Sequence, residues 1–239
     1  MSGRLSLFER DRGEENGVDE RAIEQSPLKR AFELMLSTDV RLFLGARGFT
    51  QRDNAFRRSR GPLYDVIGFQ GNWHNGNTPS HGYFINVGIG STEVDSTWPY
   101  ENLGDWPLHG CLLDRRWESV VPDLPYEIRF GRATDMVAFA DALCEGLGHV
   151  IAVFDEFECT STLVRYAVEN NLLIQYELTC CYLAAVDDGD SLIAYVGLLH
   201  DRFGHQERWS IFNRRISQVT GAWTSTLVQL GLLDPIDET

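Results

Sequence analysis

The sequence predicts an α+β fold, in which a small antiparallel sheet with a packed helix is followed by a helical C-terminal half. Two observations carry this prediction. Apolar residues recur with a period of two around the segments 64–70 and 82–90, as expected for strands that bury one face. From Thr134 onward the apolar residues recur at helical spacing instead. Strands grouped before helices are typical of the α+β class.

The length of the chain bounds its domain organisation. It has 239 residues with 43% hydrophobic content, which is ample for one large domain or two small ones. We divide it into a flexible tail over residues 1–19, an α+β region over 20–132 and a helical region over 133–239. We expect the helical region to pack on the α+β region as one continuous globule.

The first half is predicted element by element. Ser26 and Pro27 form an N-cap followed by proline at the first helical position. Gly45 and Gly48 can each end the second helical stretch. The strands 64–70 and 82–90 form a hairpin, because the intervening loop 71–81 is too rich in Gly, Asn, Pro and Ser for regular structure. The sequence predicts a further strand over 112–121 and an extended segment over 126–130.

The second half is predicted to be helical throughout. Thr134 caps a helix that ends at Gly146 or Gly148. The apolar segment 150–157 is ambiguous, and we interpret it as a buried helical continuation because helices flank it. Residues 172–186 are apolar nearly all round, which predicts a central buried helix. The acidic turn 187–190 breaks it, and the segments 191–203 and 206–232 supply the last helices.

Charge and cysteine usage indicate the compartment and the kind of partner. The net charge is −14, from 35 acidic and 21 basic residues, which argues against nucleic-acid binding and fits electrostatic steering toward a basic protein partner. Residues 1–20 have no apolar run of signal-peptide length, and no run of roughly 18 apolar residues predicts a membrane span. The five cysteines are an odd number, as expected of free thiols. We therefore expect a cytoplasmic protein that does not bind membranes.

A set of short segments in the first half resembles a known family. Gly48-Phe49, Phe56-Arg57, the strand 66–70, the strand 84–88 and Cys111 with Arg115-Arg116 follow one another as in the DUF4304 family of uncharacterised bacterial proteins. The resemblance covers about residues 30–130. It implies an α+β domain with an antiparallel sheet. It implies no activity, cofactor or substrate, so no functional residue can be carried over.

No catalytic, cofactor or metal motif stands out in the sequence. His74, His81 and His109 fall in or beside loops, where exposed histidines are the simplest expectation, and their spacing is not that of a zinc site. Cys144 and the pair Cys180-Cys181 lie in apolar segments, which is typical of small buried side chains. We therefore name no catalytic residue, no metal ligand and no cofactor.

Two groups of residues are candidates for binding a partner. Asp155, Glu156 and Glu158 form either a solvated helix face or an acidic patch for a basic partner. Three loop tryptophans serve either as interface anchors or as cover for the sheet edge, namely Trp73, Trp98 and Trp106. The leading hypothesis is an intracellular protein-binding module. Its more specific form is an immunity or antitoxin-type protein whose acidic surface occludes a basic partner enzyme.

Two alternatives belong to other functional classes. The first is an enzyme whose active site follows no motif and lies in a cleft between sheet and helices, lined by Arg57, Gln70, Asn86 and Arg116. The second is a structural subunit of a larger assembly, which requires an exposed apolar face on the segment 209–232. The sequence leaves the oligomeric state and the identity of any partner open.

Overall fold

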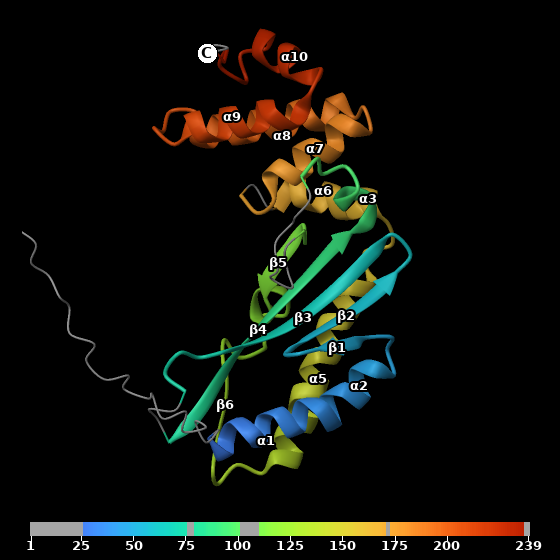
Figure 1. Cartoon of the computed structure of the whole chain (residues 1–239), viewed down its shortest axis with the longest axis vertical. Helices are drawn as coiled ribbons and strands as arrows, with labels where there is room; N and C mark the ends of the chain where they lie inside the picture. Colours follow the sequence, from blue (N-terminus) through green and yellow to red (C-terminus); the bar gives the residue numbers. More distant parts are fainter. Residues whose placement is uncertain (1–25, 76–78, 101–109, 171–172, 237–239) are drawn as a thin grey trace, which may run out of the picture.

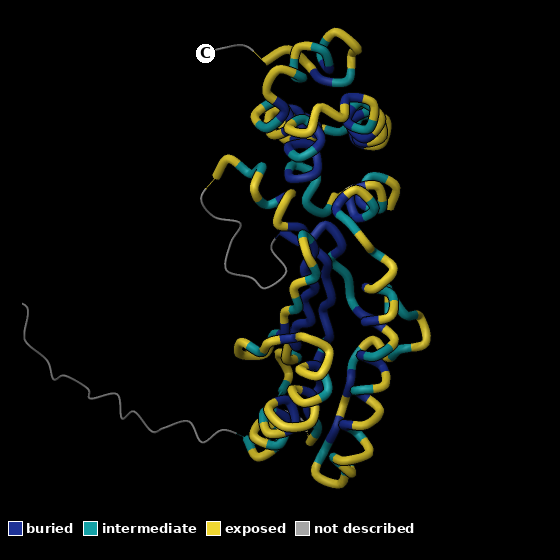
Figure 2. Tube along the Cα trace, turned by 90° about the vertical axis from the view of Figure 1, so that its right-hand side faces the viewer, coloured by how far each residue is buried: buried dark blue, intermediate teal, exposed yellow. Residues whose placement is uncertain are grey.

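The computed structural model describes residues 26–75, 79–100, 110–170 and 173–236. The molecule is elongated, with the sheet and its helices at one end and a stack of helices at the other (Figure 1). Most buried apolar side chains form one cluster that reaches from Phe32 to Leu233, and a second, small cluster holds Tyr64, Val66 and Cys111. Figure 2 shows buried residues at both ends of the molecule. The predicted α+β fold with a helical C-terminal half is confirmed. The predicted tail over residues 1–19 lies outside the described residues.

The chain enters the fold through one helical rod made of three pieces: α1 (Pro27–Met35), the π-helical turn η1 (Leu36–Val40) and α2 (Arg41–Gly45). Pro27 occupies the first helical position, as predicted. The Ser26 side chain does not cap the helix, and its hydroxyl lies 3.3 Å from His81 Nε2 instead. The rod buries a stripe of apolar side chains in the core: Phe32, Met35, Leu36, Val40 and Leu44.

Six antiparallel strands form the sheet: β1 (Thr50–Arg52), β2 (Ala55–Arg60), β3 (Leu63–Gly71), β4 (Ser80–Ser91), β5 (Leu113–Arg116) and β6 (Ile128–Gly131). β3 and β4 are the predicted hairpin, and Ile67 lies opposite Val87. β5 pairs with the second half of β4, and β6 pairs with the beginning of β4. Both short strands therefore extend the same edge of the hairpin.

The predicted strand over 112–121 is wrong in its second half. Residues Trp117–Val120 form the short helix α4. The Trp117 side chain is 2% exposed, and its Nε1 donates a hydrogen bond to the Pro125 carbonyl at 2.7 Å. The chain turns at this point because the turn buries the indole in the core and gives its N–H an acceptor. A buried indole N–H without a partner is costly.

The long helix α5 (Met136–Asp155) covers one face of the sheet. Asp135 caps it by accepting hydrogen bonds from the next backbone amides, so the predicted cap at Thr134 is wrong by one residue. The Thr134 hydroxyl accepts from the Gly131 amide instead. The helix also runs through Gly146 and Gly148 rather than ending there, so the interpretation of residues 150–155 as its continuation is confirmed. A Cβ on Gly146 would lie 3.0 Å from the Trp117 ring, so this glycine allows close packing within the helix.

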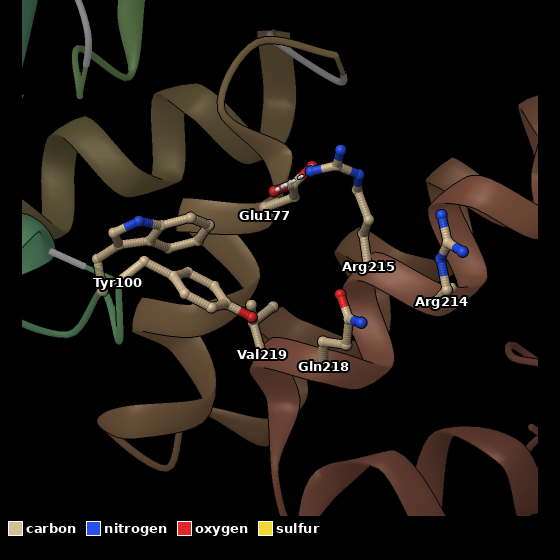
Figure 3. Close-up of a pocket in the computed structure, with 7 residues that line it drawn as sticks. Tyr100, Glu177, Arg214, Arg215, Gln218 and Val219 are labelled. Atoms are coloured by element: carbon tan, nitrogen blue, oxygen red, sulfur yellow. Dashed lines mark hydrogen bonds and ion pairs between the residues drawn. The ribbon is translucent and has the colours of Figure 1, made fainter. Parts of the chain in front are cut away.

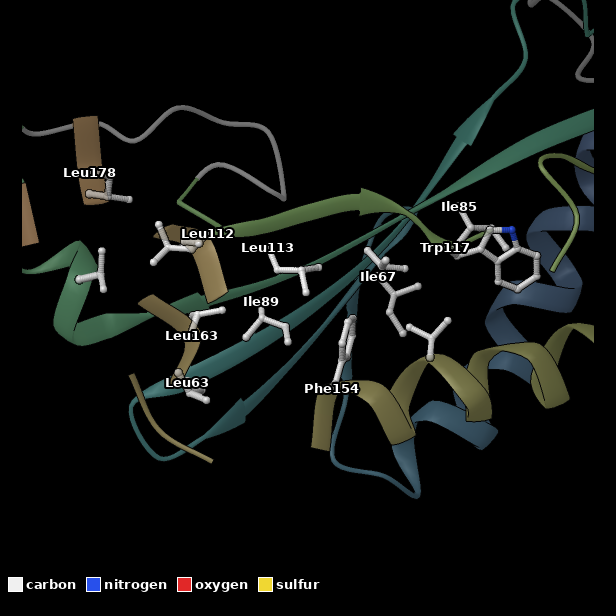
Figure 4. Close-up of a cluster of buried hydrophobic side chains, with 14 of the residues drawn as sticks. Leu63, Ile67, Ile85, Ile89, Leu112, Leu113, Trp117, Phe154, Leu163 and Leu178 are labelled. Atoms are coloured by element: carbon white, nitrogen blue, oxygen red, sulfur yellow. The ribbon is translucent and has the colours of Figure 1, made fainter. Parts of the chain in front are cut away.

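The core between α5 and the sheet is built from alternating residues of β3 and β4. Ile67, Ile85 and Ile89 are fully buried on this face and lie near Phe154 of α5 (Figure 4). By length and composition alone, α5 is a helix that could cross a membrane. Within the molecule, 39% of its most apolar stretch is buried, and core helices can have the same length and composition.

An ionic network fastens the end of α5 to the sheet. The buried Asp65 carboxylate of β3 accepts from Arg58 Nε at 2.7 Å and from Arg60 Nε and Nη2 at 2.8 Å each. Arg60 also donates to the carbonyls of Phe154 and Phe157 at 3.0 and 2.8 Å. These carbonyls lie at and just after the end of α5, where the helix dipole favours a cation. One guanidinium thus neutralises the buried acid and caps the helix.

Five helices form the C-terminal stack: α6 (Thr160–Asn170), α7 (Tyr176–Ala185), α8 (Gly189–Phe203), α9 (Trp209–Thr220) and α10 (Trp223–Gln229). The buried helix predicted over 172–186 is α7, which begins later, at Tyr176. Its side chains from Leu178 to Cys181 are buried, and it packs on α8 and α9. The acidic turn breaks the chain as predicted, because Asp187 has a φ of 60° and Asp188 caps α8 by accepting from the Ser191 amide.

Candidate functional site

The three acids of the predicted acidic patch lie in different surroundings. Asp155 lies 2.6 Å from Arg58 Nη2 and is therefore part of the network that holds α5 to the sheet. Glu156 and Glu158 are exposed in the turn between α5 and α6. No ion pair of either glutamate occurs among the described residues. Only these two acids of the predicted patch are therefore free to meet a partner.

The fold adds acids from two distant segments to Glu158. The Ser91 hydroxyl at the start of α3 (Thr92–Asp95) lies 2.8 Å from the Thr160 hydroxyl at the start of α6. This buried contact brings the first turn of α3, with the exposed Glu93, next to the turn that contains Glu158. The end of α7 lies against α3. Acids from the first half of the chain and from the helical half therefore meet at one place.

A tyrosine marks the centre of this surface. Tyr182 of α7 is half-buried, and its pKa is raised, first by burial and then by the nearby Glu93, Cys159 and Asp188. Glu93 lies on α3, Cys159 directly before α6 and Asp188 directly before α8, so groups from three segments lie near Tyr182. We call the surface made of Glu93, Glu158, Asp188 and Tyr182 the acidic corner. Its acids stand at or just before helix N-termini, where the helix dipole stabilises negative charge.

The loop tryptophans lie in different surroundings. Trp73 is 82% exposed and its ring centroid is 3.5 Å from that of His74. His74 lines a cavity of about 270 Å³ together with polar residues that include Asn72 and Glu127. Asn72 Nδ2 already donates to Glu127 Oε1 at 2.7 Å, so these groups satisfy one another. Trp106 lies outside the described residues.

Trp98 lines a second cavity, of about 390 Å³, between the segment after α3 and the helices α7 and α9 (Figure 3). Its ring packs against the core on one side and meets Tyr100 edge to face, with the centroids 5.2 Å apart. The opposite wall carries charged and polar side chains: Glu177, Arg214, Arg215 and Gln218. Trp98 is therefore neither a freely exposed anchor nor a cover of the sheet edge.

The four residues predicted to line the alternative cleft lie on the face of the sheet that α5 does not cover. Gln70, Asn86 and Arg116 are neighbours there, since Asn86 pairs with Arg116 and donates from Nδ2 to Gln70 Oε1 at 3.4 Å. Arg116 lies over the Phe84 ring, with its guanidinium 4.5 Å from the centroid. Arg57 is farther along the same face and stacks on Tyr64 at 3.8 Å.

The four residues lie outside three cavities of the molecule. None of them lines the cavities near Trp73 and Trp98, or the third cavity, of about 790 Å³, near Ser26 and His81. The arginines are held against aromatic rings, a contact that stabilises a sheet face without any ligand. These contacts give no support to the enzyme alternative, which stays a prediction.

Three further expectations concern histidine, cysteine and the last helices. His81 is 4% exposed, so the expectation of an exposed loop histidine is wrong for it. Among the described residues no group of three His, Cys, Asp or Glu could hold a metal ion. Trp209, Phe212 and Ile216 of α9 are buried. Ile211 and Leu230 of the segment 209–232 are exposed, so the apolar face that the structural-subunit alternative requires is buried only in part.

Sequence reasoning missed several residues that these surfaces contain. Glu93 and Asp188 were not joined to Glu158, and Arg214 and Arg215 were not joined to Trp98. The only local signal was that Glu93 and Asp188 stand at helix starts. Nothing in the spacing of these residues along the chain shows that they meet.

Comparison with known proteins identifies a family for part of the chain. The model of the DUF4304 family, described as a domain of unknown function, matches residues 40–152. The resemblance seen in the sequence is confirmed, and the match extends beyond the predicted residues 30–130 to include most of α5. This extension agrees with the packing, because α5 covers the sheet. No curated protein and no solved structure matches the chain.

Proposed function

We propose that the protein is an intracellular protein-binding module that holds a basic protein partner at the acidic corner. The observation that carries the proposal is that Glu93 and Asp188 lie near Tyr182, and that Glu158 directly precedes Cys159, a third neighbour of this tyrosine. In its specific form the partner is a toxin-like enzyme, and the module inhibits it by occlusion, as an immunity protein would. Such a role needs no catalytic residue in this chain.

The two kinds of side chain in the acidic corner have different tasks. Exposed carboxylates at the rim of an interface raise the association rate of a basic partner and make it dependent on salt, while adding little to affinity. A half-buried tyrosine supplies apolar area at low entropic cost and is enriched among residues that dominate binding energy. We therefore expect the acids to control the association rate and Tyr182 to control the dissociation rate.

The cysteines support the intracellular part of the proposal. All five are free thiols, and Cys111, Cys180 and Cys181 are buried. Secreted proteins of this size commonly use such residues in disulfides, whereas reducing compartments keep them as thiols.

The first experiment is affinity capture of the tagged full chain from its host at low and high salt, followed by mass spectrometry. A stoichiometric basic protein that is lost at high salt is expected. The partner is then purified, and its binding is measured by surface plasmon resonance with the variant Glu93→Gln, Glu158→Gln, Asp188→Asn. Asparagine at 188 preserves the helix cap, so the variant removes charge and leaves the fold intact.

The matched control removes the same charge elsewhere, through Asp141→Asn, Glu145→Gln and Glu169→Gln on exposed positions of α5 and α6. The acidic-corner variant should associate at least about tenfold more slowly at low salt, and the control should stay near the wild type. Equal rates for the two variants would remove the acidic corner from the interface. Capture of no basic partner would refute the proposed function itself.

A further inference from the structure

The cavity lined by Trp98 has a composition unlike the rest of this acidic molecule. Arg214 and Arg215 of α9 line it together with Trp98 and Tyr100, and Figure 3 shows Tyr100 across the cavity from the two arginines. Glu177 of α7 is the only acid among the residues that line it. The cavity is therefore locally cationic, although the net charge of the chain is −14.

The charges of the cavity are not all available to a ligand. Arg215 Nη1 donates to both oxygens of Glu177, at 3.1 and 3.2 Å, so these two side chains neutralise one another. Arg214 is exposed and makes no ion pair within the described part of the chain. The cavity therefore presents one uncompensated guanidinium, with the Gln218 amide beside it as a neutral hydrogen-bonding group. Guanidinium groups bind phosphate oxygens through paired donors.

The aromatic wall is held in place before any ligand arrives. The Trp98 amide donates to the Asp95 carbonyl at 3.2 Å, and the Cys181 thiol donates to the Thr97 carbonyl at 3.0 Å. These contacts fix the segment after α3 against α7. Tyr100 is 54% exposed, so part of its side chain is open to a ligand. A fixed ring offered to a planar ligand costs little ordering entropy on binding.

We propose that this cavity binds a small anionic ligand made of a planar ring and a phosphate group, of about the size of a mononucleotide. The ring stacks on Tyr100 beside Trp98, and the phosphate oxygens accept hydrogen bonds from Arg214. The volume of about 390 Å³ lies within the range of small-molecule sites. The site is independent of the acidic corner, which favours cations.

The test is isothermal titration of the full chain with three probes: AMP, adenosine and ribose 5-phosphate. AMP combines the ring and the phosphate, and each of the others lacks one of them. We expect saturable AMP binding with a dissociation constant below about 1 mM, and at least tenfold weaker binding of both other probes. Equal binding of AMP and ribose 5-phosphate would overturn the stacking half of the proposal, and equal binding of AMP and adenosine would overturn the phosphate half.

Variants locate the binding at this cavity. Arg214→Ala should weaken AMP binding at least about tenfold, and Tyr100→Ala by a similar factor, whereas Tyr100→Phe should bind as the wild type does. Arg165→Ala removes the same charge from an exposed position of α6 and serves as the control. Thermal melts confirm that each variant is folded. Absence of saturable binding, or equal loss in Arg214→Ala and Arg165→Ala, would overturn the proposal.

The outcome is distinguishable from that of the proposed function. The acidic-corner variant should bind AMP as the wild type does, because its three substitutions lie outside the residues that line the cavity. Loss of AMP binding in that variant would show that the two surfaces are not independent and would overturn this site assignment.

Discussion

Replacing Asp65 with asparagine should destabilise the protein more than any surface charge change. Asp65 is fully buried and is held by Arg58 and Arg60, whose side chains are only 11% and 19% exposed. Asparagine keeps the size of the side chain and removes its negative charge. The two guanidinium groups would then remain largely buried beside a neutral amide, which also presents donors where acceptors are needed.

The expected loss follows from the contacts. Breaking a buried ion pair by removing one partner costs about 3–5 kcal/mol, because the other charge stays buried without compensation. Arg58 retains Asp155, and Arg60 retains the carbonyls at the end of α5, so the lower end of this range applies. A loss of about 3 kcal/mol is a large share of the 5–15 kcal/mol that stabilises a typical domain.

The assay is urea denaturation followed by circular dichroism and tryptophan fluorescence. We expect the midpoint to fall by about 1 M or more with an unchanged slope. Asp155→Asn is the matched control, because its side chain is 52% exposed and shares the same Arg58, so its loss should stay within about 1 kcal/mol. If the two variants lose equal stability, the buried network does not fasten α5 to the sheet as argued.

Three further predictions concern packing, reactivity and pH. Gly90→Ala should cost about 1–3 kcal/mol in urea denaturation, because a Cβ there would lie 2.2 Å from Tyr64 Cζ, and an unchanged midpoint would show that the ring can move. Cys159 should be the first cysteine to react with iodoacetamide in peptide mapping. Hydrogen bonds with Ser161 and Thr162 lower the pKa of its thiol, whereas burial raises the pKa of the other four cysteines. Earlier labelling of a buried thiol would contradict this prediction. Burial raises the pKa of Cys144 to about 11 and that of Tyr83 to about 12. Above about pH 9 both groups ionise in the unfolded chain while they stay neutral in the folded state, so the stability of the fold should fall as the pH rises. A flat profile of urea midpoints between pH 8 and 11 would refute this prediction.

Local pattern was sufficient for most elements of the fold. The hairpin of β3 and β4, the turn at the end of α2 and the continuation of α5 beyond Gly148 all follow from periodicity and turn chemistry in neighbouring residues. Trp117 shows where this reasoning fails. Its segment has the composition of a strand, but the indole gains more by burial against α5 with a hydrogen bond to Pro125 than by continuing the sheet.

The candidate surfaces could be predicted only in part. Exposed acids in the turn after α5 were visible in the sequence as Glu156 and Glu158. Asp155 was counted with them, since nothing local shows its ion pair with Arg58, which lies 97 residues earlier in the chain. A carboxylate on a helix end looks the same in sequence whether it faces water or a distant arginine.

The sequence by itself determined the fold class, the resemblance of residues 40–152 to the DUF4304 family, the negative charge and the order of most elements. Only the tertiary structure decided that Glu93 and Asp188 lie near Tyr182 and that Arg214 lines the same cavity as Trp98 and Tyr100. The physical reason is one of range. Periodicity records which face of each element is buried, whereas the meeting of residues from different elements depends on how helices dock on the sheet and on one another.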